Sequence, residues 1–385
     1  MTDNFEVTLD NCHKEPIHIP GSIQPHGYLL VVDPATMTLS CVSENVTELC
    51  GAGLSDCIGK SLAEVVDEDY CAIINKHWQT EKLQLFNPTS VQIKHVDCTL
   101  RKMTAIATFN GSVILIALEP DSKVSDNAYE SVLKMLKNSV QSLMGVHKLD
   151  LIYQTVVEEV KRFSGFDRVM LYQFDHEYNG EVIAEAKEPH LNAFLKQHFP
   201  ESDIPKQARE LYIKNPIRLL CDVEAEVSRL YPAQPHVDLS YCSLRSVSPI
   251  HIQYLRNMGV KASMSISIII NGRLWGLIAC HHYSSKFVPF EVREIAQYIS
   301  VMLSQLISVK IQEEDTQRNA RQLAMLGQIS AAMAEEQEYQ NALRIKAEQL
   351  LALVDASGAV WCLDGSLQSA GEVPEQNIIK HLHQW

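Results

Sequence analysis

Apolar and polar residues alternate with a period of two in residues 28–119, the pattern of half-buried strands. The segment YLLVVDPATMTLSCVS predicts a hairpin that turns at Asp33-Pro34. Residues 89–118 predict further strands around an Asn110-Gly111 turn, and a helical pattern occupies 61–80. These elements predict a small α+β domain with an antiparallel sheet.

The same alternation returns in residues 147–300. Four segments read as strands, namely DRVMLYQFD, GEVIAEAKE, ASMSISIII and RLWGLIACHHY, and Asn271-Gly272 forms a hairpin turn between the last two. Residues 128–163 between the two domains have the apolar spacing of an amphipathic helix. The pattern therefore predicts a second α+β domain that follows a polar linker and a helix.

A long helix is predicted after Phe290, because no Gly or Pro occurs before Gly327. Its apolar positions follow a heptad spacing: Ile295, Ile299, Met302, Leu306 and Val309. We expect this stripe to pair with a second copy of the chain, and packing on its own domain is the alternative. A third α+β segment begins at GAVWCLDG (358–365), and the sequence ends before it could complete a domain.

Composition narrows the classes of function. The net charge is 33 − 47 = −14, which argues against a general nucleic-acid or anionic-membrane binder. The ten cysteines show no CxxC pair and no zinc spacing, so we expect no metal site and a reducing compartment. The N-terminus lacks an apolar signal segment, and the apolar runs are too short to span a bilayer. A cytoplasmic protein is expected.

Candidate chemistry gathers in three places. The arm DNCHKEPIHIPGSIQPHG (10–27) holds a thiol among histidines and prolines, FPESDIP places Asp203 before a rigid Ile204-Pro205, and LRSVSPIHIQYLRNMG supplies Arg245, Ser248, His251 and Tyr254. Taken singly, each residue is more typical of a core side chain or a surface ion pair than of a ligand site. Together, two arginines, serines, histidines and aromatics suit a large, flat ligand with two carboxylates.

Four motifs, CHKEPIHIPGSIQPHG, FPESDIP, LRSVSPIHIQYLRNMG and LWGLIACHHY, resemble those of bacterial phytochromes, in particular the biliverdin-binding subgroup. The resemblance covers essentially the whole chain. It implies an N-terminal arm, PAS and GAF domains, and a long helix into an incomplete PHY domain. The expected bounds are 1–27 for the arm, 28–119 for PAS, 120–146 for the linker and helix, 147–300 for GAF, 301–352 for the connecting helix and 353–385 for the start of PHY.

The resemblance also implies how the pigment is held. Cys12 would form a thioether with the ring A vinyl group of biliverdin IXα. The arm would pass through a GAF loop in a figure-of-eight knot, with Ile23 at the threaded position. Plant-type phytochromes instead use a cysteine directly before the pocket histidine, where this chain has Ile250. We therefore expect attachment at Cys12, with Cys242 as the first alternative.

Further pocket roles follow from the resemblance. Arg218 and Arg245 would bind the two propionates, helped by Tyr212, Ser248, Ser263 and Ser265. His251 and the main-chain carbonyl of Asp203, in the Asp203-Ile204-Pro205 motif, would surround a central water. His281 would bind the ring D carbonyl, and Tyr172, Phe199 and Tyr254 would line the space around ring D.

The resemblance also implies a signalling route. Light would isomerise the C15=C16 bond of the bilin. A parallel homodimer, joined through GAF and the long helices, would then pass the signal to an output domain or response regulator that is not visible in the sequence. The PRxSF-like tongue motif of the family is missing from these 385 residues, so Asp203 has no visible partner and a full photocycle is in doubt if the chain is whole.

Three alternatives remain. The chain could be the sensory front of a histidine kinase or diguanylate cyclase, although no ATP site, GGDEF-type loop or phosphate-binding Gly-rich loop occurs in it, so we expect no catalysis within it. It could be a PAS–GAF sensor of another small molecule, which would not need Cys12. A nucleophilic enzyme using Cys12 and His13 is the weakest, since sequence neighbours rarely have triad geometry.

Overall fold

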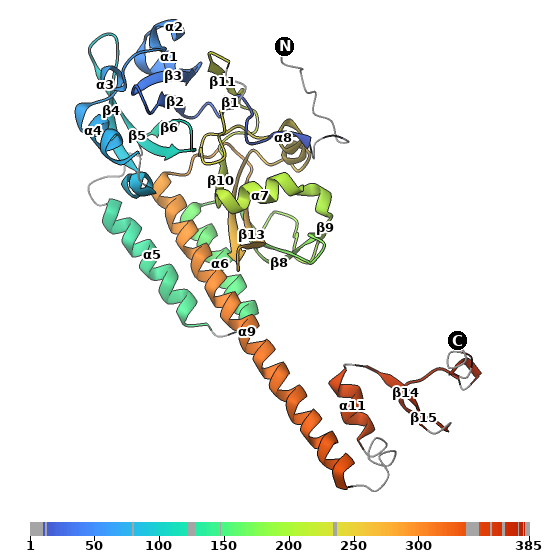
Figure 1. Cartoon of the computed structure of the whole chain (residues 1–385). Helices are drawn as coiled ribbons and strands as arrows, with labels where there is room; N and C mark the ends of the chain where they lie inside the picture. The colour runs from blue at the N-terminus through green and yellow to red at the C-terminus, as the bar shows by residue number, and fades with distance from the viewer. Residues whose placement is uncertain are drawn as a thin grey trace. The chain divides into compact units, whose positions relative to one another are not determined.

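The structure is a computed structural model that describes residues 11, 14–78, 81–121, 128–146, 148–233, 237–335, 346–354, 356–363, 366–375, 377–379 and 381 (Figure 1). The chain divides into two compact units, Met1–Gln305 and Leu306–Trp385. The first unit contains two antiparallel sheets, and the second contains a two-stranded ribbon within its described part. Each unit is described by itself.

The first sheet contains the strands predicted within residues 28–119 and adds two strands from outside that range. Its strand order is β1-β11-β3-β2-β6-β5-β4. The strands are β1 (Ser22–Ile23), β2 (Tyr28–Asp33), β3 (Thr38–Ser43), β4 (Thr89–Lys94), β5 (Leu100–Phe109), β6 (Ile114–Pro120) and β11 (Ser228–Tyr231), and the helices beside them are α1 (Val46–Cys50), α2 (Leu54–Cys57), α3 (Leu62–Val65), α4 (Glu68–His77) and η2 (Glu81–Phe86). Alternate strand residues such as Leu30 and Val32 are buried under these helices in one apolar core.

The second sheet confirms the four strands predicted for residues 147–300 and adds two more. Its order is β10-β12-β13-β7-β8-β9. The strands are β7 (Arg168–Phe174), β8 (Gly180–Lys187), β9 (His198–Phe199), β10 (Ile217–Leu220), β12 (Ala262–Ile270) and β13 (Arg273–His282). Helix α6 (Leu149–Ser164) packs on β7 and β8, whereas η3 (Glu201–Asp203), α7 (Lys206–Lys214) and α8 (Pro249–Asn257) lie over the other face (Figure 1).

The N-terminal arm is tied to segments more than 190 residues away. β1 pairs with β11, and Ile23, which is fully buried, bridges to Arg245. The Gln24 side chain donates to the Leu219 carbonyl at 2.7 Å and accepts from the Cys221 amide at 3.2 Å. These bonds hold the arm beside β10 and β11, two short strands that the sequence did not predict.

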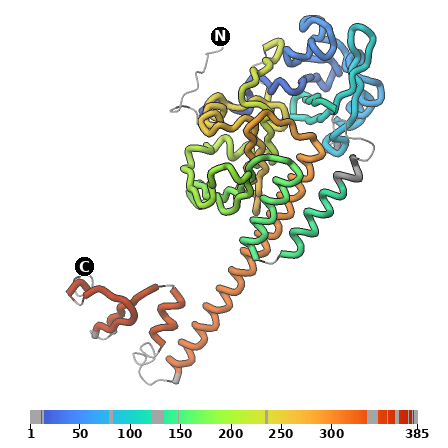
Figure 2. Tube along the Cα trace, turned by 180° about the vertical axis from the view of Figure 1, so that it is seen from behind, coloured from blue at the N-terminus to red at the C-terminus, as the bar shows by residue number. Residues whose placement is uncertain are grey.

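The helical region differs from the prediction in one respect. Residues 128–163 were expected to be helical throughout, and the structure has two helices, α5 (Ala128–Met144) and α6, separated near Gly145. They run side by side in both views (Figures 1 and 2). The break lets α6 lie along the sheet while α5 packs on the side of α6 away from the sheet.

Helix α9 (Phe290–Glu335) confirms the long helix. The prediction that the heptad stripe pairs with a second copy is wrong for the first part of the helix, because Ile295 and Ile299 are at most 1% exposed inside the first unit. A heptad spacing suits packing on the helix's own sheet as well as packing on a partner. Val309, in contrast, is exposed.

A buried ion pair joins β6 to the start of α9. Arg293 donates to Glu119, and both side chains are at most 5% exposed. Ser243 donates to the other Glu119 oxygen at 2.8 Å, so the carboxylate has partners on both oxygens.

In the second unit, α9 continues from Leu306, and α11 (Ala347–Leu353) precedes the ribbon of β14 (Gly358–Leu363) and β15 (Ser366–Gly371). This confirms strands in the third predicted segment. Across the described residues of both units, no helix combines the length and apolar character needed to cross a bilayer.

Candidate functional site

One face of the second sheet forms the floor of a cavity. Because strand side chains alternate between faces, the pairing register shows which residues share the floor. Ser265 lies opposite Arg218, and Ser263 lies opposite both Leu220 and His281. Leu277 lies opposite Tyr172 on the neighbouring strand. All of these residues line the cavity.

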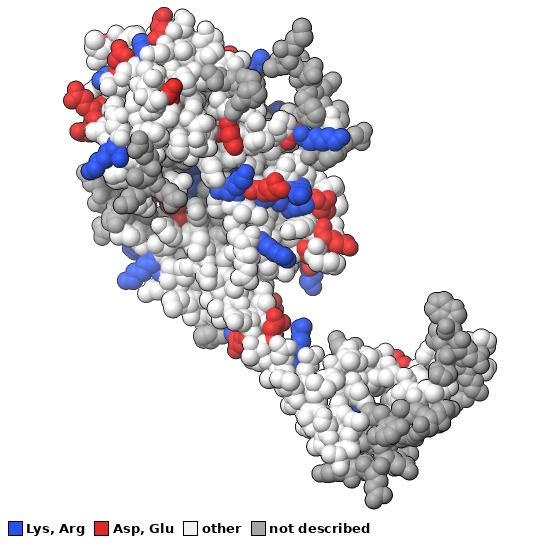
Figure 3. Space-filling model, viewed as in Figure 1, with Lys and Arg blue, Asp and Glu red and all other residues white. Residues whose placement is uncertain are grey.

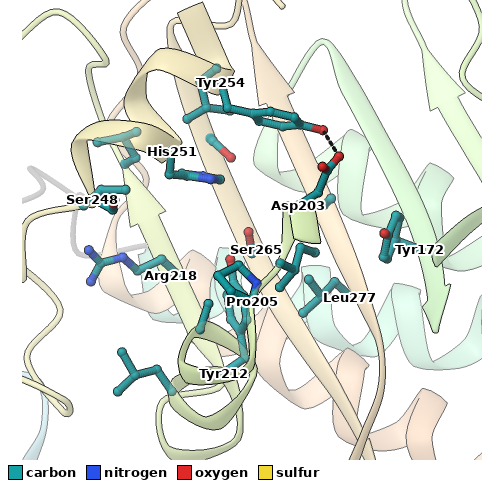
Figure 4. Close-up of a pocket in the computed structure, with 18 of the residues that line it drawn as sticks. Tyr172, Asp203, Pro205, Tyr212, Arg218, Ser248, His251, Tyr254, Ser265 and Leu277 are labelled. Carbon is teal, nitrogen blue, oxygen red and sulfur yellow. Dashed lines mark hydrogen bonds between the residues drawn. The ribbon is translucent and has the colours of Figure 1, made fainter. Parts of the chain in front are cut away.

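The wall above this floor comes from the loop at 199–205 and from α7 and α8 (Figure 4). Pro205 is the N-cap of α7, which fixes where the preceding Asp203-Ile204 backbone enters the cavity. Ser248 is the N-cap of α8. His251 and Tyr254 lie one turn apart on the inner side of this helix, with their rings stacked and the ring centroids 6.1 Å apart.

Asp203 has a partner that the sequence did not reveal. The Tyr254 hydroxyl donates to the Asp203 carboxylate at 3.4 Å, and Figure 4 draws this bond across the cavity. Burial raises the pKa of Asp203, and the bond from Tyr254 acts against the rise. Burial and the Asp203 charge together raise the pKa of Tyr254 to about 12. Tyr254 is therefore a partner of Asp203 within the chain, and the absence of a tongue arginine as its salt-bridge partner stays a prediction.

Two buried arginines, Arg218 and Arg245, line the cavity, and Figure 4 shows Arg218 on the side opposite Tyr172 and Asp203. Arg218 donates to the main-chain carbonyls of Arg245 and Ser246, and Arg245 donates to the carbonyl of Ile17 at 2.6 Å. Among the described residues, Arg218 Nη1 and Arg245 Nε are buried without a hydrogen-bond acceptor. Burial lowers the pKa of both guanidinium groups, and for Arg218 the nearby Arg245 adds to the effect. A buried donor without an acceptor costs roughly 1–3 kcal/mol, so this end favours an acidic ligand.

The two cavity histidines are held in the neutral form. Burial, followed by the charge of Arg218, lowers the pKa of His251 to about 4. Burial, followed by the charges of Arg168 and His251, lowers the pKa of His281 to about 3. A neutral imidazole carries one donor and one acceptor nitrogen, so each ring can bind an N–H or a carbonyl. The adjacent His282 points away from the cavity to Asp167, at 2.8 Å.

The cavity brings together every pocket residue predicted from the sequence. They are Tyr172, Phe199, Asp203, Ile204, Pro205, Tyr212, Arg218, Arg245, Ser248, His251, Tyr254, Ser263, Ser265 and His281. Their individual roles stay predictions. Cys12, the predicted attachment residue, lies with His13 outside the described residues.

The sequence analysis missed several lining residues. Met170, Leu277 and Ala279 follow from the alternation of β7 and β13 once the face is known. Glu15 and Ile17 come from the arm, and no local pattern connects them to the cavity. Ser248 donates to the Glu15 carboxylate at 2.6 Å, across 233 residues of sequence.

The described cysteines do not reach the cavity. None is among its lining residues, and Ile250 occupies the position before His251. Cys242 is 2% exposed in the core beside the arm, and burial raises the pKa of its thiol to about 11. Cys242 is therefore a poor candidate for covalent attachment.

No group of three or more histidine, cysteine or acidic side chains suited to a metal ion occurs in the described part of the chain. On the face shown in Figure 3, basic and acidic side chains are interspersed. The cavity, with its paired arginines and aromatic walls, is the feature that points to a ligand.

Comparison of the sequence with known proteins identifies the family to which the chain belongs. The sequence matches the family models of the PAS fold over residues 12–121, the GAF domain over 148–311 and the phytochrome region over 322–385. All residues that line the cavity lie in the GAF match, except Glu15 and Ile17 of the arm, which lie in the PAS match.

Curated relatives and solved structures agree with these matches. A cyanobacterial phytochrome B from Nostoc sp. is 37% identical over all of the chain and 52% of the relative, and a Pseudomonas aeruginosa bacteriophytochrome is 34% identical over 99% of the chain and 52% of the relative. The photosensory core module of a Stigmatella aurantiaca phytochrome is similar in structure, with a TM-score of 0.86 at 35% identity, over 100% of this chain and 76% of that one.

The chain belongs to the phytochrome family, as a PAS-GAF-PHY photosensory module with α9 leading into PHY. It spans about half the length of the curated relatives named above. Cyanobacterial phytochromes and bacteriophytochromes both occur among the relatives, so the comparisons leave the identity of the pigment open.

Proposed function

We propose that this chain is a light sensor that binds a bilin in the cavity of its GAF domain. The observation that carries the proposal is the pair of buried arginines, Arg218 and Arg245, whose free N–H groups lie at one end of a cavity walled by aromatic residues. A bilin is a flat, conjugated tetrapyrrole with two propionates. Arginine forks bind carboxylates in bidentate fashion, and aromatic side chains pack on planar rings.

The remaining polar groups suit the rest of such a ligand. Ser263 and Ser265 lie beside Arg218 on the sheet, and Tyr212 lies above them on α7, where they can bind a propionate. His251, neutral through burial, offers an acceptor nitrogen toward the pyrrole N–H groups, together with the carbonyl of Asp203. His281 can donate to a ring carbonyl from the opposite strand.

We assign the photochemical end of the cavity to the cluster of Tyr172, Phe199, Asp203 and Tyr254. The bilin supplies the light-absorbing system and its isomerisable C15=C16 bond. The chain supplies a turning space with aromatic walls, since the rings of Tyr172 and Phe199 lie 5.9 Å apart, and one hydrogen bond that can change, from Tyr254 to Asp203. A ring that turns there would compete for the Asp203 carboxylate.

Biliverdin linked to Cys12 is the pigment we propose, and phycocyanobilin is the alternative. The support is indirect: the position used by plant-type phytochromes is Ile250, and the nearest other thiol, Cys242, is buried away from the cavity. In this proposal the arm carries the thiol and Ile23 anchors it in the knot, since the arm pairs with β11 and bridges to Arg245.

The attachment test compares wild type, Cys12→Ser and Cys242→Ser, each incubated with biliverdin and with phycocyanobilin. Denaturing gels with zinc-induced fluorescence then report covalent pigment. We expect a covalent biliverdin adduct in wild type and in Cys242→Ser, and none in Cys12→Ser. An adduct that persists in Cys12→Ser would overturn the assignment of Cys12, and covalent attachment of phycocyanobilin alone would overturn that of biliverdin.

We further propose that two copies pair in parallel and that α9 carries the signal toward an output domain of the histidine kinase or diguanylate cyclase class. Since Ile295 and Ile299 are buried, the proposed interface is the outer side of the helices, where Tyr298, Val301 and Leu151 are exposed. Val301→Glu should convert a dimer into a monomer in light scattering, whereas Glu314→Gln, farther along α9, should not. A monomeric wild type at micromolar concentration would contradict this interface.

A further inference from the structure

The arm places an acidic side chain at the end of the cavity that holds the arginines. Glu15 lines the cavity beside Ile17, whose carbonyl accepts from Arg245. The Glu15 carboxylate accepts from Ser248 Oγ at 2.6 Å, and it interacts with the charge of Arg245. The two residues proposed above to bind a propionate therefore both interact with an internal carboxylate.

The Glu15 carboxylate is chemically equivalent to the propionate that we propose is bound beside it. Its carboxylate has the same charge and the same acceptor atoms as a ligand propionate, it accepts from Ser248, and it feels the charge of Arg245. Burial raises the pKa of Glu15, while Ser248 and Arg245 act against the rise, as expected for an acid held partly out of water beside a cation.

The other acidic neighbour of Arg245 differs from Glu15. Asp238 also acts on Arg245, but it accepts the amide of Ser240 at 2.7 Å and is not a lining residue. Of the two carboxylates, Glu15 is the one that a bound acid would meet. A carboxylate brought to Arg245 therefore meets the negative charge of Glu15, and it must displace Glu15 to accept from Ser248.

We propose that Glu15 is a specificity-determining residue, an internal anion that competes with an acidic side chain of the ligand at Arg245 and Ser248. The inference rests on the proposed bilin function. In this role Glu15 weakens binding of the free acid and leaves binding of the uncharged ring system unchanged. It thereby reduces how strongly the cavity favours dicarboxylate pigments over esters.

The test separates charge from structure. Glu15→Gln removes the charge and keeps an oxygen that accepts from Ser248, and Glu15→Ala removes both. Glu44→Gln, on an exposed residue after β3, changes the net charge equally and serves as the matched control. All variants are made in a Cys12→Ser background, so that binding is reversible. The two probes are biliverdin and its dimethyl ester, which share one ring system, and dissociation constants are measured by absorbance titration.

We expect Glu15→Gln and Glu15→Ala to bind the diacid about tenfold more tightly than the parent, a ratio that corresponds to about 1.4 kcal/mol. Binding of the diester should change by less than about twofold, and Glu44→Gln should match the parent with both probes. The gain for the diacid should shrink as salt is raised, because it is electrostatic.

Two results would overturn the inference in different ways. If the parent binds both probes and the Glu15 variants change neither affinity, or change both equally, Glu15 is a structural tether of the arm and the bilin function stands. If the parent binds neither probe, the proposed function fails and the inference fails with it. Melting temperatures of the ligand-free variants show whether a loss of both affinities comes from misfolding.

Discussion

Buried arginines occur in two settings in this molecule, and the comparison separates structure from function. Arg293 at the start of α9 faces the buried Glu119, and Arg168 on β7 faces the buried Glu185. Arg218 and Arg245 instead donate to main-chain carbonyls, and no carboxylate in the described part of the chain forms a salt bridge with either. Among the described residues, each of the four arginines keeps one buried N–H group without an acceptor, so the difference lies in the carboxylate. The chain pairs Arg168 and Arg293 with a buried carboxylate, whereas Arg218 and Arg245 are left without such a pair there and can take the carboxylates of a ligand.

The energetic meaning of this difference follows from the cost of burying charge. A buried ion pair that loses one partner leaves an unpaired charge, which costs several kcal/mol. A buried cation that already lacks an acidic partner has less folding stability to lose. Its contribution appears when an anion binds. A change at Glu119 should therefore affect mainly the free energy of unfolding, whereas a change at Arg218 should affect mainly the affinity for the ligand.

The largest effect is expected at the structural pair. Glu119→Gln should lower the free energy of unfolding by about 3–5 kcal/mol, because it leaves Arg293 charged and buried. Replacing both residues, with Glu119→Leu and Arg293→Met, should cost much less than the single change. Urea unfolding of the full chain measures both, with Glu44→Gln as the exposed control. A loss below about 1 kcal/mol for Glu119→Gln would remove the distinction between the two settings.

The next largest effect is expected on the affinity for the bilin. Arg218→Met should change the unfolding free energy by no more than about 1 kcal/mol, yet weaken bilin binding by about a hundredfold, since a buried charge-assisted contact is lost. Arg256→Met, at a half-exposed pair with Glu224, should leave binding unchanged. The comparison would be wrong if Arg218→Met unfolded the chain as readily as Glu119→Gln does.

The cavity histidines sharpen the comparison through pH. The folded-state pKa of His281 is about 3, below the ordinary 6.5, so the unfolded chain binds the extra proton between these values. Stability should therefore fall as the pH drops from 6.5, by about 2 kcal/mol at pH 5 from this residue. His281→Gln should remove that part of the slope in urea titrations at pH 7 and pH 5. An unchanged slope would mean that folding does not lower the pKa of His281, so that the residue is protonated in the folded chain at pH 5.

The smallest effect concerns the Asp203–Tyr254 bond. Tyr254→Phe removes a hydrogen bond that lowers the pKa of Asp203, so this pKa should rise further above its usual value. Carbon-13 NMR titration of labelled aspartate would report the shift. Tyr283→Phe serves as the control, because Tyr283 lies outside the cavity. If the Asp203 pKa fell instead, the bond in the structure would not describe the protein in solution.

Local patterns in the sequence predicted most of the fold. The alternation in β7, β12 and β13 and the turns at Asp33-Pro34 and Asn271-Gly272 depend on neighbouring residues, so they can be read directly. The short strands β10 and β11 could not be predicted, because four residues carry little periodicity and their partners lie far away in sequence. The heptad stripe misled for the same reason: spacing shows an apolar face but not what covers it.

The site followed from residue types together with the family resemblance. Arg218, His251 and Asp203 were predicted because their motifs are distinctive, and the structure places them on one cavity. Glu15 was not predicted, because its meaning depends on Ser248, 233 residues away. A charge in a loop becomes interpretable as part of a ligand site when its partners are known.

The most direct test of the central claim fills the cavity. Ala279 lies on the cavity floor opposite Ser265, and Ala279→Trp should occupy the space of a bilin without adding charge. Biliverdin is titrated into wild type and into this variant, with absorbance and circular dichroism recorded. We predict one equivalent bound with a strong red band in wild type and none in the folded variant. Equal binding by both would place the pigment elsewhere, and no binding by wild type would contradict the assignment of a bilin sensor.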